Sequence, residues 1–236
     1  MPFTVVTCTG DRPEAFEICK WMMAKQTQKP TQWIIVDDGH TPIQPPTESY
    51  VQYVRRIRDP KEGHYTIVAQ FKTALEYVGW DHVIVMEDDD WYSHLYLETM
   101  RSFLDKAQLV GNSHNVYYFM RDAKCFVHEN TKHSSLCSTA FRRDMFKTVL
   151  SVHSTQVFLD LKLWNCRKCT KHLFTPDPLL VLGIKQLPGR TGPTHEANRT
   201  ILRAGLRDDS NGHYFHRVVG EDFQLYTPYL GGDVHA

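Results

Sequence analysis

Short apolar runs that stop abruptly at acidic residues constrain the fold of this chain more than any other feature. Residues 33–36 are apolar throughout and stop at Asp-Asp-Gly, and the strand predicted over residues 82–86 runs directly into the acidic run Glu87–Asp90. Runs that are apolar at every position are typical of parallel strands that helices cover on both faces. The sequence therefore predicts an α/β fold with a doubly wound, mostly parallel sheet.

Strand and helix signals alternate along the first half of the chain, and strands recur in the second half. No stretch between the halves has the composition of a linker, so we expect one domain over residues 1–236. Apolar spacing predicts helices over residues 16–23 and 67–78. Further strands are predicted over residues 3–8, 51–54, 116–120 and 179–184, with a strand turning into a helix over residues 138–146.

Three of the predicted strands end in polar, glycine or acidic residues, at positions 7–12, 37–39 and 87–90. In open parallel sheets, ligands bind at the carboxyl ends of the strands. We therefore expect these three segments to form one binding site.

The acidic run Glu87–Asp90 is a candidate metal site. Consecutive aspartates repel one another, and a divalent cation offsets that repulsion because hard cations prefer carboxylate oxygens. Mg²⁺ typically uses one or two protein carboxylates and completes its shell with phosphate and water, which suits a diphosphate ligand. A solvated acidic loop is the alternative, although the preceding strand and Trp91-Tyr92 anchor the run.

The overall charge excludes a general polyanion binder, since 27 basic residues balance 27 acidic ones. The balance is uneven, because residues 1–110 carry 11 basic and 16 acidic side chains whereas residues 111–236 carry 16 and 11. The second half also holds nine of the 13 histidines. This asymmetry suits a metal site in the first half and an anionic ligand that reaches the second, but two ordinary solvated faces explain it equally well.

The six cysteines are scattered along the chain, so free thiols in a reducing compartment are expected. The first residues lack the basic segment and the long apolar run of a signal peptide. No stretch approaches the ~20 apolar residues that a membrane span requires. We therefore expect a cytoplasmic protein without a transmembrane segment.

Taken together, the three strand ends resemble the inverting glycosyltransferases of family 2, which have the GT-A fold. The matching features are a strand ending in a Thr/Arg-Pro turn (residues 5–13), a Val-Asp-Asp-Gly turn (36–39) and a strand ending in a DXD-type motif (83–90). The resemblance implies a Rossmann-like sheet with a C-terminal acceptor-side extension. Residues 1–110 then bind a nucleotide-sugar, and residues 111–236 bind the acceptor and supply a C-terminal lid.

The activity that this resemblance implies is metal-dependent transfer of a sugar, with inversion, from a UDP- or GDP-linked donor to an acceptor hydroxyl. It also implies roles for individual residues of the donor pocket. Asp37 and Asp38 are expected near the nucleobase and the ribose. Thr7, Thr9 and Arg12 are expected to line the same pocket.

The acidic run fits the metal motif of the family in two registers. In one, Asp88 meets the ribose or the sugar and Asp89 binds the metal; in the other, Glu87 and Asp89 are the motif pair. Asp89 appears in both registers, and Asp90 is a further candidate ligand. The ion implied is Mn²⁺ or Mg²⁺.

Asp160 is the candidate general base that deprotonates the acceptor hydroxyl, by analogy with a carboxylate near the start of a helix in the second half of the family's enzymes. An aspartate in an apolar neighbourhood has a raised pKa. The Glu-Asp pair that is usual in the family is missing here, so a helix-capping or surface aspartate is the alternative. Asp144 is the second candidate.

Residues 189–195, Gly-Arg-Thr-Gly-Pro-Thr-His, resemble the loop that many GT-A enzymes close over the diphosphate. The glycines permit hinge motion. Arg190 is then expected to contact phosphate, and His195 to add a metal ligand.

Cys166 and Cys169, followed by His172, form a second candidate metal site. Two cysteines separated by two residues suit a structural Zn²⁺. Free surface thiols are the alternative, because one such pair without a partner pair is a weak signal. The fourth ligand would come from Cys125, His128, His133 or Cys137.

The sequence leaves the acceptor and two other functions open. A saccharide or glycolipid acceptor is the usual one for this class, but the basic pairs at 142–143 and 167–168 also suit a hydroxymethylated base in DNA. A nucleotidyltransferase would need a longer glycine-rich phosphate loop with a lysine than residues 9–12 supply. A non-catalytic module that binds nucleotide-sugars or carbohydrates is disfavoured by the density of acidic residues.

Overall fold

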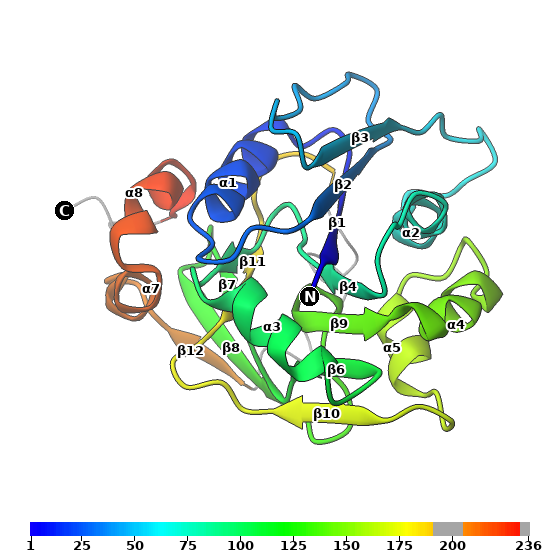
Figure 1. Ribbon diagram of the computed structural model, residues 1–236. Coiled ribbons are helices and arrows are strands. Elements are labelled where there is room, and N and C mark those ends of the chain that lie inside the picture. Colours follow the sequence, from blue (N-terminus) through cyan, green and yellow to red (C-terminus); the bar gives the residue numbers. More distant parts are fainter. Residues whose placement is uncertain (191–204, 232–236) are drawn as a thin grey trace.

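The computed structural model describes residues 1–190 and 205–231, and within them two sheets form the framework (Figure 1). The larger sheet consists of β1 (Phe3–Thr9), β2 (Gln32–Asp37), β3 (Val51–Arg55), β4 (His82–Val85), β6 (Leu109–Asn112), β9 (Thr139–Arg142) and β10 (Lys171–Phe174). The smaller sheet consists of β5 (Trp91–Tyr92), β7 (His114–Phe119), β8 (Lys124–Glu129), β11 (Val181–Lys185) and β12 (Leu206–Asp208).

The larger sheet has the strand order β10-β6-β9-β4-β1-β2-β3. Strands β3, β2, β1 and β4 pair with one another in parallel, whereas β9 is antiparallel to both β4 and β6. The predicted α/β fold with a mostly parallel sheet is therefore confirmed. The carboxyl ends of β1, β2 and β4 lie at one edge, because these strands pair in parallel.

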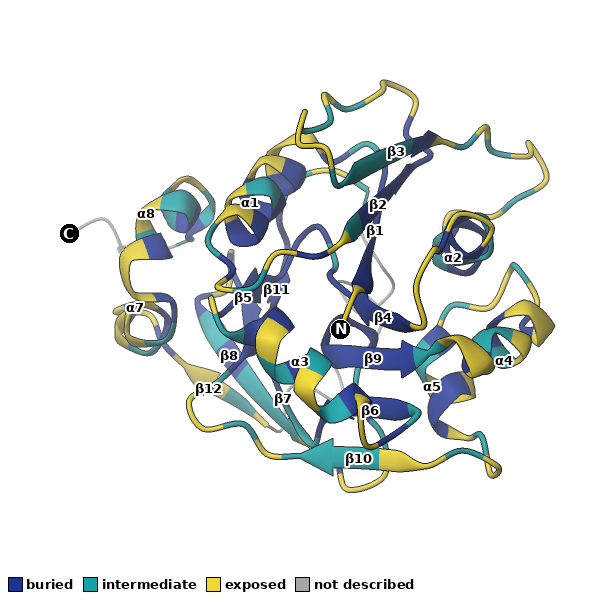
Figure 2. Ribbon diagram, in the orientation of Figure 1, coloured by how far each residue is buried: buried dark blue, intermediate teal, exposed yellow. Residues whose placement is uncertain are grey.

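Helices cover both faces of the larger sheet (Figure 1). Val5 and Ile35 contribute to one core, while their neighbours Val6 and Ile34 contribute to the other, as alternation along a strand requires. One face is covered by α1 (Pro13–Ala24) and α3 (Tyr96–Leu104), the other by α2 (Ile67–Leu75), α4 (Phe146–Ser151) and α5 (Leu159–Trp164). β1 and β4 are buried along their whole length, which explains the apolar residues at their centres (Figure 2).

The second half of the chain extends the larger sheet only in part. β6, β9 and β10 join it, but β7, β8, β11 and β12 build the smaller sheet, whose strand order is β12-β8-β7-β11-β5. The sequence predicted one mostly parallel sheet, and the smaller sheet is an addition that it did not predict. Periodicity reveals a strand but not its partner, because pairing depends on residues far apart in the sequence.

The carboxylate of Asp222 links the C-terminal segment to the first half of the chain through hydrogen bonds and an ion pair. Asp222 accepts hydrogen bonds from the Nε1 atoms of Trp21 (2.9 Å) and Trp91 (2.8 Å), and it also pairs with Lys25. It precedes α8 (Phe223–Tyr226) and follows α7 (His213–Val219).

No helix among the described residues has the length and apolar character needed to cross a membrane.

Candidate active site

A cavity of about 220 Å³ lies at the carboxyl edge of the larger sheet. It brings together two of the three strand ends predicted from the sequence and residues from the second half of the chain. Its lining includes Thr9, Gly10, Arg12, Glu87, Asp88 and Asp89 from the strand ends, and Tyr117, Cys137, Asp160, Lys185 and Arg190 from the second half.

Arg12 ties the turn after β1 to the acidic run after β4. Its Nη1 atom lies 3.2 Å from Asp88 Oδ1, and its Nη2 atom lies 2.6 Å from Asp89 Oδ2. Thr9 Oγ1 donates to Asp88 Oδ2 at 2.7 Å. Burial raises the pKa of Asp88 to about 6, although Arg12 and Thr9 act in the opposite direction. The two aspartates are thus held in place by the segment predicted to share their site.

Asp90 lies in a different setting from Asp88 and Asp89. It is fully buried, and its Oδ1 atom accepts a hydrogen bond from the backbone N–H of Ile184 at 2.8 Å. Lys185 Nζ lies 3.8 Å from the same oxygen. Burial raises the pKa of Asp90 to about 6, with Lys185 opposing the shift. The acidic run is therefore joined to β11 of the smaller sheet.

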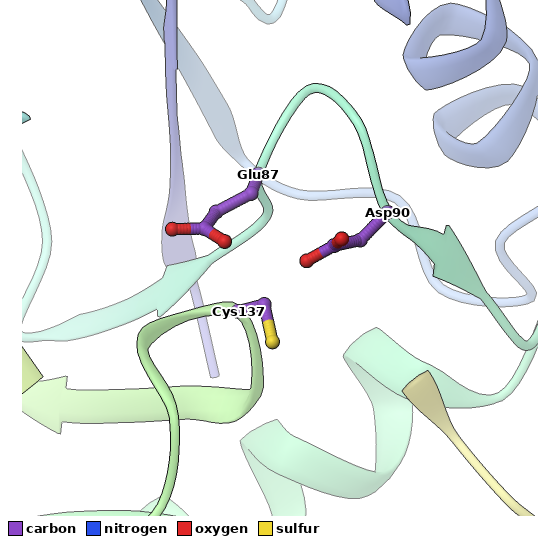
Figure 3. Close-up of side chains that lie close together, drawn as sticks. All are labelled: Glu87, Asp90 and Cys137. Atoms are coloured by element: carbon purple, nitrogen blue, oxygen red, sulfur yellow. The ribbon is translucent and has the colours of Figure 1, made fainter. Parts of the chain in front are cut away.

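Glu87, Asp90 and Cys137 form a group suited to holding a metal ion, with one ligand atom from each lying within 4.8 Å of the others (Figure 3). Asp90 Oδ2 is buried without a conventional hydrogen-bond partner among the described residues. Burial and the neighbouring Asp90 raise the pKa of Glu87 well above its ordinary value. Of the predicted ligands, Asp90 belongs to this group, Asp89 is instead engaged by Arg12, and His195 lies outside the described residues.

The two aspartates at the end of β2 have different surroundings. Asp37 accepts hydrogen bonds from the N–H groups of Gly39 (2.9 Å) and Ile43 (3.0 Å) and from the hydroxyl of Tyr53 (2.7 Å). Its carboxylate therefore stabilises the turn and does not line the cavity. Asp38 forms ion pairs with Arg190 and, at 3.1 Å, with Arg56. It also lines a second hollow, together with residues 39–40 and 55–60.

Thr7 does not line the cavity, contrary to the prediction. Its side chain is fully buried, donates a hydrogen bond to the Met86 carbonyl at 2.8 Å, and accepts one from Trp33 Nε1 at 2.9 Å. The strand continues to Thr9, so alternation turns Thr7 into the protein and leaves Thr9 as the threonine at the site.

Asp160, the candidate base, lines the cavity from the first turn of α5. Burial raises its pKa to about 6. Asp144, the second candidate, does not reach the site. It is exposed, lies in the turn after β9 and accepts a hydrogen bond from Gln108. Because β9 is antiparallel to β4, its end lies at the edge of the sheet opposite the cavity.

Gly189 and Arg190 are the first two residues of the predicted lid, and Arg190 lines the cavity. Gly189 has φ +98°, and a Cβ there would lie 2.4 Å from the Asp11 carbonyl oxygen, so glycine is required. Arg190 donates from its backbone N–H to the same carbonyl at 3.3 Å, and its guanidinium pairs with Asp38. Residues 191–195 of the predicted lid lie outside the described residues.

The predicted zinc site does not assemble within the described part of the chain. Cys166 and Cys169 are neighbours, but His172 packs against the rings of Phe103 and Phe174, whose centroids lie 4.4 and 5.9 Å from its own. These three residues form no three-ligand group, and the proposed fourth ligands do not join them. Strand β10 carries His172 away from the pair.

Among the residues of the site that were not predicted, Lys185 and Cys137 are the two nearest to the acidic run that carry a charge or a metal-binding atom. Lys185 is the last residue of β11, directly after an apolar run, so the rule that directed attention to the other strand ends would have found it. Nearby acidic groups, Asp90 foremost, raise its pKa, although burial opposes this. Cys137 lies in a short 3-10 turn before β9. It carries no local signal as a ligand for the acidic run.

Comparisons with known proteins extend these observations. The family model described as "Glycosyl transferase family 2" matches residues 4–159. A search among curated proteins finds no match. The crystal structure of S. aureus TarS 1-349 is similar with a TM-score of 0.52 and 13% identity, over 78% of this chain and 60% of that one.

The crystal structure of S. aureus TarS has a TM-score of 0.52 and 13% identity, over 78% of this chain and 37% of that one. The structure of TarS 1-349 in complex with UDP-GlcNAc has a TM-score of 0.50 and 12% identity, over 80% and 60% of the two chains. The chain thus spans at most about 60% of these proteins. At such identities the likeness concerns the fold.

Proposed function

The chain belongs to glycosyl transferase family 2, and from this premise we propose that it is a glycosyltransferase that moves a sugar from a UDP-linked donor to an acceptor hydroxyl with inversion. The observation that carries the proposal is the cavity in which Arg12 and the acidic run meet Asp160. Such a site offers cationic groups for a diphosphate and a carboxylate for the acceptor.

The donor end of the cavity is formed by Arg12, Arg190 and the acidic run. The two guanidiniums suit the oxygens of a diphosphate, since arginine binds such groups through paired hydrogen bonds. Asp38, which pairs with Arg190, is the carboxylate that we assign to the nucleoside part. The similar TarS structure contains UDP-GlcNAc, which supports a UDP-linked donor.

A divalent cation is part of this proposal. Asp89 and Asp90, with Glu87 beside them, are the carboxylates that would hold Mn²⁺ or Mg²⁺. The fit is supported by Asp90 Oδ2, which is buried without a conventional hydrogen-bond partner and faces Glu87. A bound ion of this kind offsets the negative charge that develops on a departing diphosphate.

Asp160 is the base in the proposed reaction. Its carboxylate takes the proton of the acceptor hydroxyl while that oxygen forms a bond to the anomeric carbon. The bond between this carbon and the diphosphate oxygen breaks, and Arg12 and Arg190 lie where they can stabilise the leaving diphosphate. A pKa of about 6 suits the task, because the carboxylate is ionised at neutral pH yet remains a stronger base than an exposed aspartate.

The acceptor is best matched by a saccharide or a glycolipid. Three consecutive apolar residues, Val157 to Leu159, line the cavity next to Asp160. The basic pair Arg142 and Arg143, which suited a DNA acceptor, lies at the opposite edge of the larger sheet and binds Asp81 and the Val78 carbonyl. The charges of this pair are therefore remote from the cavity.

The decisive experiment measures release of UDP from a panel of UDP-sugars, with GDP-sugars for comparison, in Mn²⁺ or Mg²⁺ and after chelation. We expect that Asp89→Asn abolishes turnover and that Glu76→Gln, an exposed control directly after α2, retains it. The anomeric configuration of the product, read by NMR, tests inversion. Thermal denaturation in the presence of each nucleotide-sugar gives an independent measure of binding. The assigned site is contradicted if no nucleotide-sugar raises the melting temperature, or if Asp89→Asn retains full turnover.

A further inference from the structure

Cys166 and Cys169 differ from the other cysteines in exposure. Both are half-buried, whereas the remaining four, Cys8, Cys19, Cys125 and Cys137, are buried. The pair follows α5 and precedes β10, in a bend of the chain. It contributes neither to the cavity nor to the group of Glu87, Asp90 and Cys137.

The two sulfurs lie against each other and are supplied with hydrogen-bond donors. Cys166 Sγ interacts with the backbone N–H of Lys168, the thiol of Cys169 and the hydroxyl of Thr148 on α4. Cys169 Sγ lies 3.7 Å from the Cys166 carbonyl oxygen, towards which its thiol also points. A sulfur that receives several donors is stabilised as a thiolate.

The positive charge of Lys171, at the start of β10, favours the thiolate form of both Cys166 and Cys169. The hydrogen bond from the backbone N–H of Lys168 is the largest cause that lowers the pKa of Cys166, and burial, the next largest cause, opposes it. Burial and the neighbouring Cys166 raise the pKa of Cys169 to about 11. One sulfur is therefore prepared as a nucleophile, and the other is held beside it as a thiol.

We propose that Cys166 and Cys169 form a reversible dithiol–disulfide site that reacts with low-molecular-weight disulfides. Their i, i+3 spacing in a bend, their mutual contact and their access to solvent are the features that such a pair requires.

The reaction proceeds by two exchanges. The Cys166 thiolate attacks one sulfur of the reagent and displaces a thiolate, which leaves a mixed disulfide on Cys166. Cys169 then loses its proton and attacks Cys166 Sγ, which displaces the second reagent thiolate. The two protons of the protein thiols end on the two reagent thiols, so the protein is oxidised by two electrons and the reagent disulfide is reduced.

The test treats the whole protein with glutathione disulfide at neutral pH and measures its intact mass and its peptide map. We expect the wild type and the control Cys125→Ala to lose the mass of two hydrogen atoms through a bond between Cys166 and Cys169, and a thiol reductant to reverse this. Cys169→Ser should retain a glutathione adduct on Cys166, because the thiol that resolves the mixed disulfide is gone. Cys166→Ser should react slowly.

A second readout is the rate of alkylation by iodoacetamide as a function of pH. Cys166 in Cys169→Ser should react on the order of tenfold faster at neutral pH than Cys169 in Cys166→Ser, because each unit of pKa changes the thiolate fraction about tenfold. Three results would overturn the proposal: a disulfide between other cysteines, no oxidation at this pair, or thiols that become reactive only after a chelator has removed bound zinc.

Discussion

The Nη2 atom of Arg12 lies 2.6 Å from Oδ2 of Asp89, and both side chains are almost entirely buried. The residue predicted to bind a metal ion is thus oriented by a cation of the protein itself. Because the same guanidinium reaches Asp88, it holds two of the carboxylates at the carboxyl end of β4 in position.

Replacing Arg12 by methionine should destabilise the protein. The change leaves Asp88 and Asp89 buried without their counter-charge, a loss that costs about 3–5 kcal/mol when a buried pair is broken. Chemical denaturation measures the effect. The matched control is Arg142→Met, which removes an exposed pair with Asp81 at 2.9 Å and should cost about 0–1 kcal/mol. Equal losses in the two variants would show that the Arg12 pairs contribute nothing beyond an ordinary surface contact.

Replacing Asp160 by asparagine should lower kcat by about 10²–10⁴-fold, the usual contribution of a general base. In the wild type the rate should decline as pH falls through about 6, because the carboxylate is then protonated. This acid limb should vanish in the variant, while binding of the UDP-sugar stays intact. Rates measured across pH, with donor affinity from calorimetry, check the prediction. An unchanged acid limb in Asp160→Asn would assign the base to another group.

The same substitution should stabilise the folded protein at neutral pH. The folded-state pKa of Asp160, about 6, exceeds its ordinary value of 3.8, so the folded state binds more protons between these limits. Its contribution to the free energy of unfolding therefore falls as pH rises from about 4 to about 6. Asp160→Asn removes this loss and should gain on the order of 1–3 kcal/mol at pH 7. Denaturation at pH 4 and pH 7 tests it, and exposed Asp144→Asn should leave both values unchanged.

Asp90→Asn separates the charge of Asp90 from its structural contact. The amide oxygen can still accept the Ile184 N–H, but the carboxylate that faces Glu87 and Cys137 is lost. We expect weaker binding of Mn²⁺, measured by calorimetry, and a loss of activity that higher Mn²⁺ concentration partly restores. Chelation should reduce wild-type turnover at least tenfold, since a metal ion contributes several kcal/mol to such a step. Unaltered Mn²⁺ affinity in Asp90→Asn would remove this residue from the metal site.

Gly189→Ala should raise the KM for the donor and lower stability by about 1–3 kcal/mol. The residue has φ +98°, and a methyl group would meet the Asp11 carbonyl oxygen, so the backbone that presents Arg190 must shift. Gly63→Ala is the control, because a Cβ at Gly63 meets nothing within 4 Å. Denaturation and donor kinetics of the two variants check the prediction, and a normal KM in Gly189→Ala would show that Arg190 does not depend on this backbone.

The sequence was sufficient for those parts of the site that depend on strands buried on both faces. β1, β2 and β4 have apolar central residues, and parallel pairing brings their ends to one edge, so Thr9, Arg12 and Asp88 were identified correctly as neighbours. Family resemblance directed attention to Asp160, which is found in the cavity.

Other parts depended on pairing that periodicity does not reveal. Asp144 follows a strand end just as the acidic run does, but β9 is antiparallel to β4, which carries Asp144 to the far edge of the sheet. Asp37 was expected to lie near the nucleobase and the ribose. Its carboxylate instead accepts hydrogen bonds from the hydroxyl of Tyr53 and from two backbone N–H groups. Cys137 reaches Asp90 through the placement of a turn, which no short sequence motif encodes.

The hydrogen bond from Ile184 to Asp90 provides the site with a built-in spectroscopic reporter. The amide nitrogen of Ile184 lies 2.8 Å from Oδ1 of Asp90, the carboxylate that we propose binds the metal ion, yet Ile184 belongs to a buried strand of the other sheet. Its NMR frequency should therefore follow the charge state of Asp90, and its exchange with deuterium should slow whenever the acidic loop is held more firmly. A single backbone resonance can thus follow occupancy of the site without any label attached to the ligand.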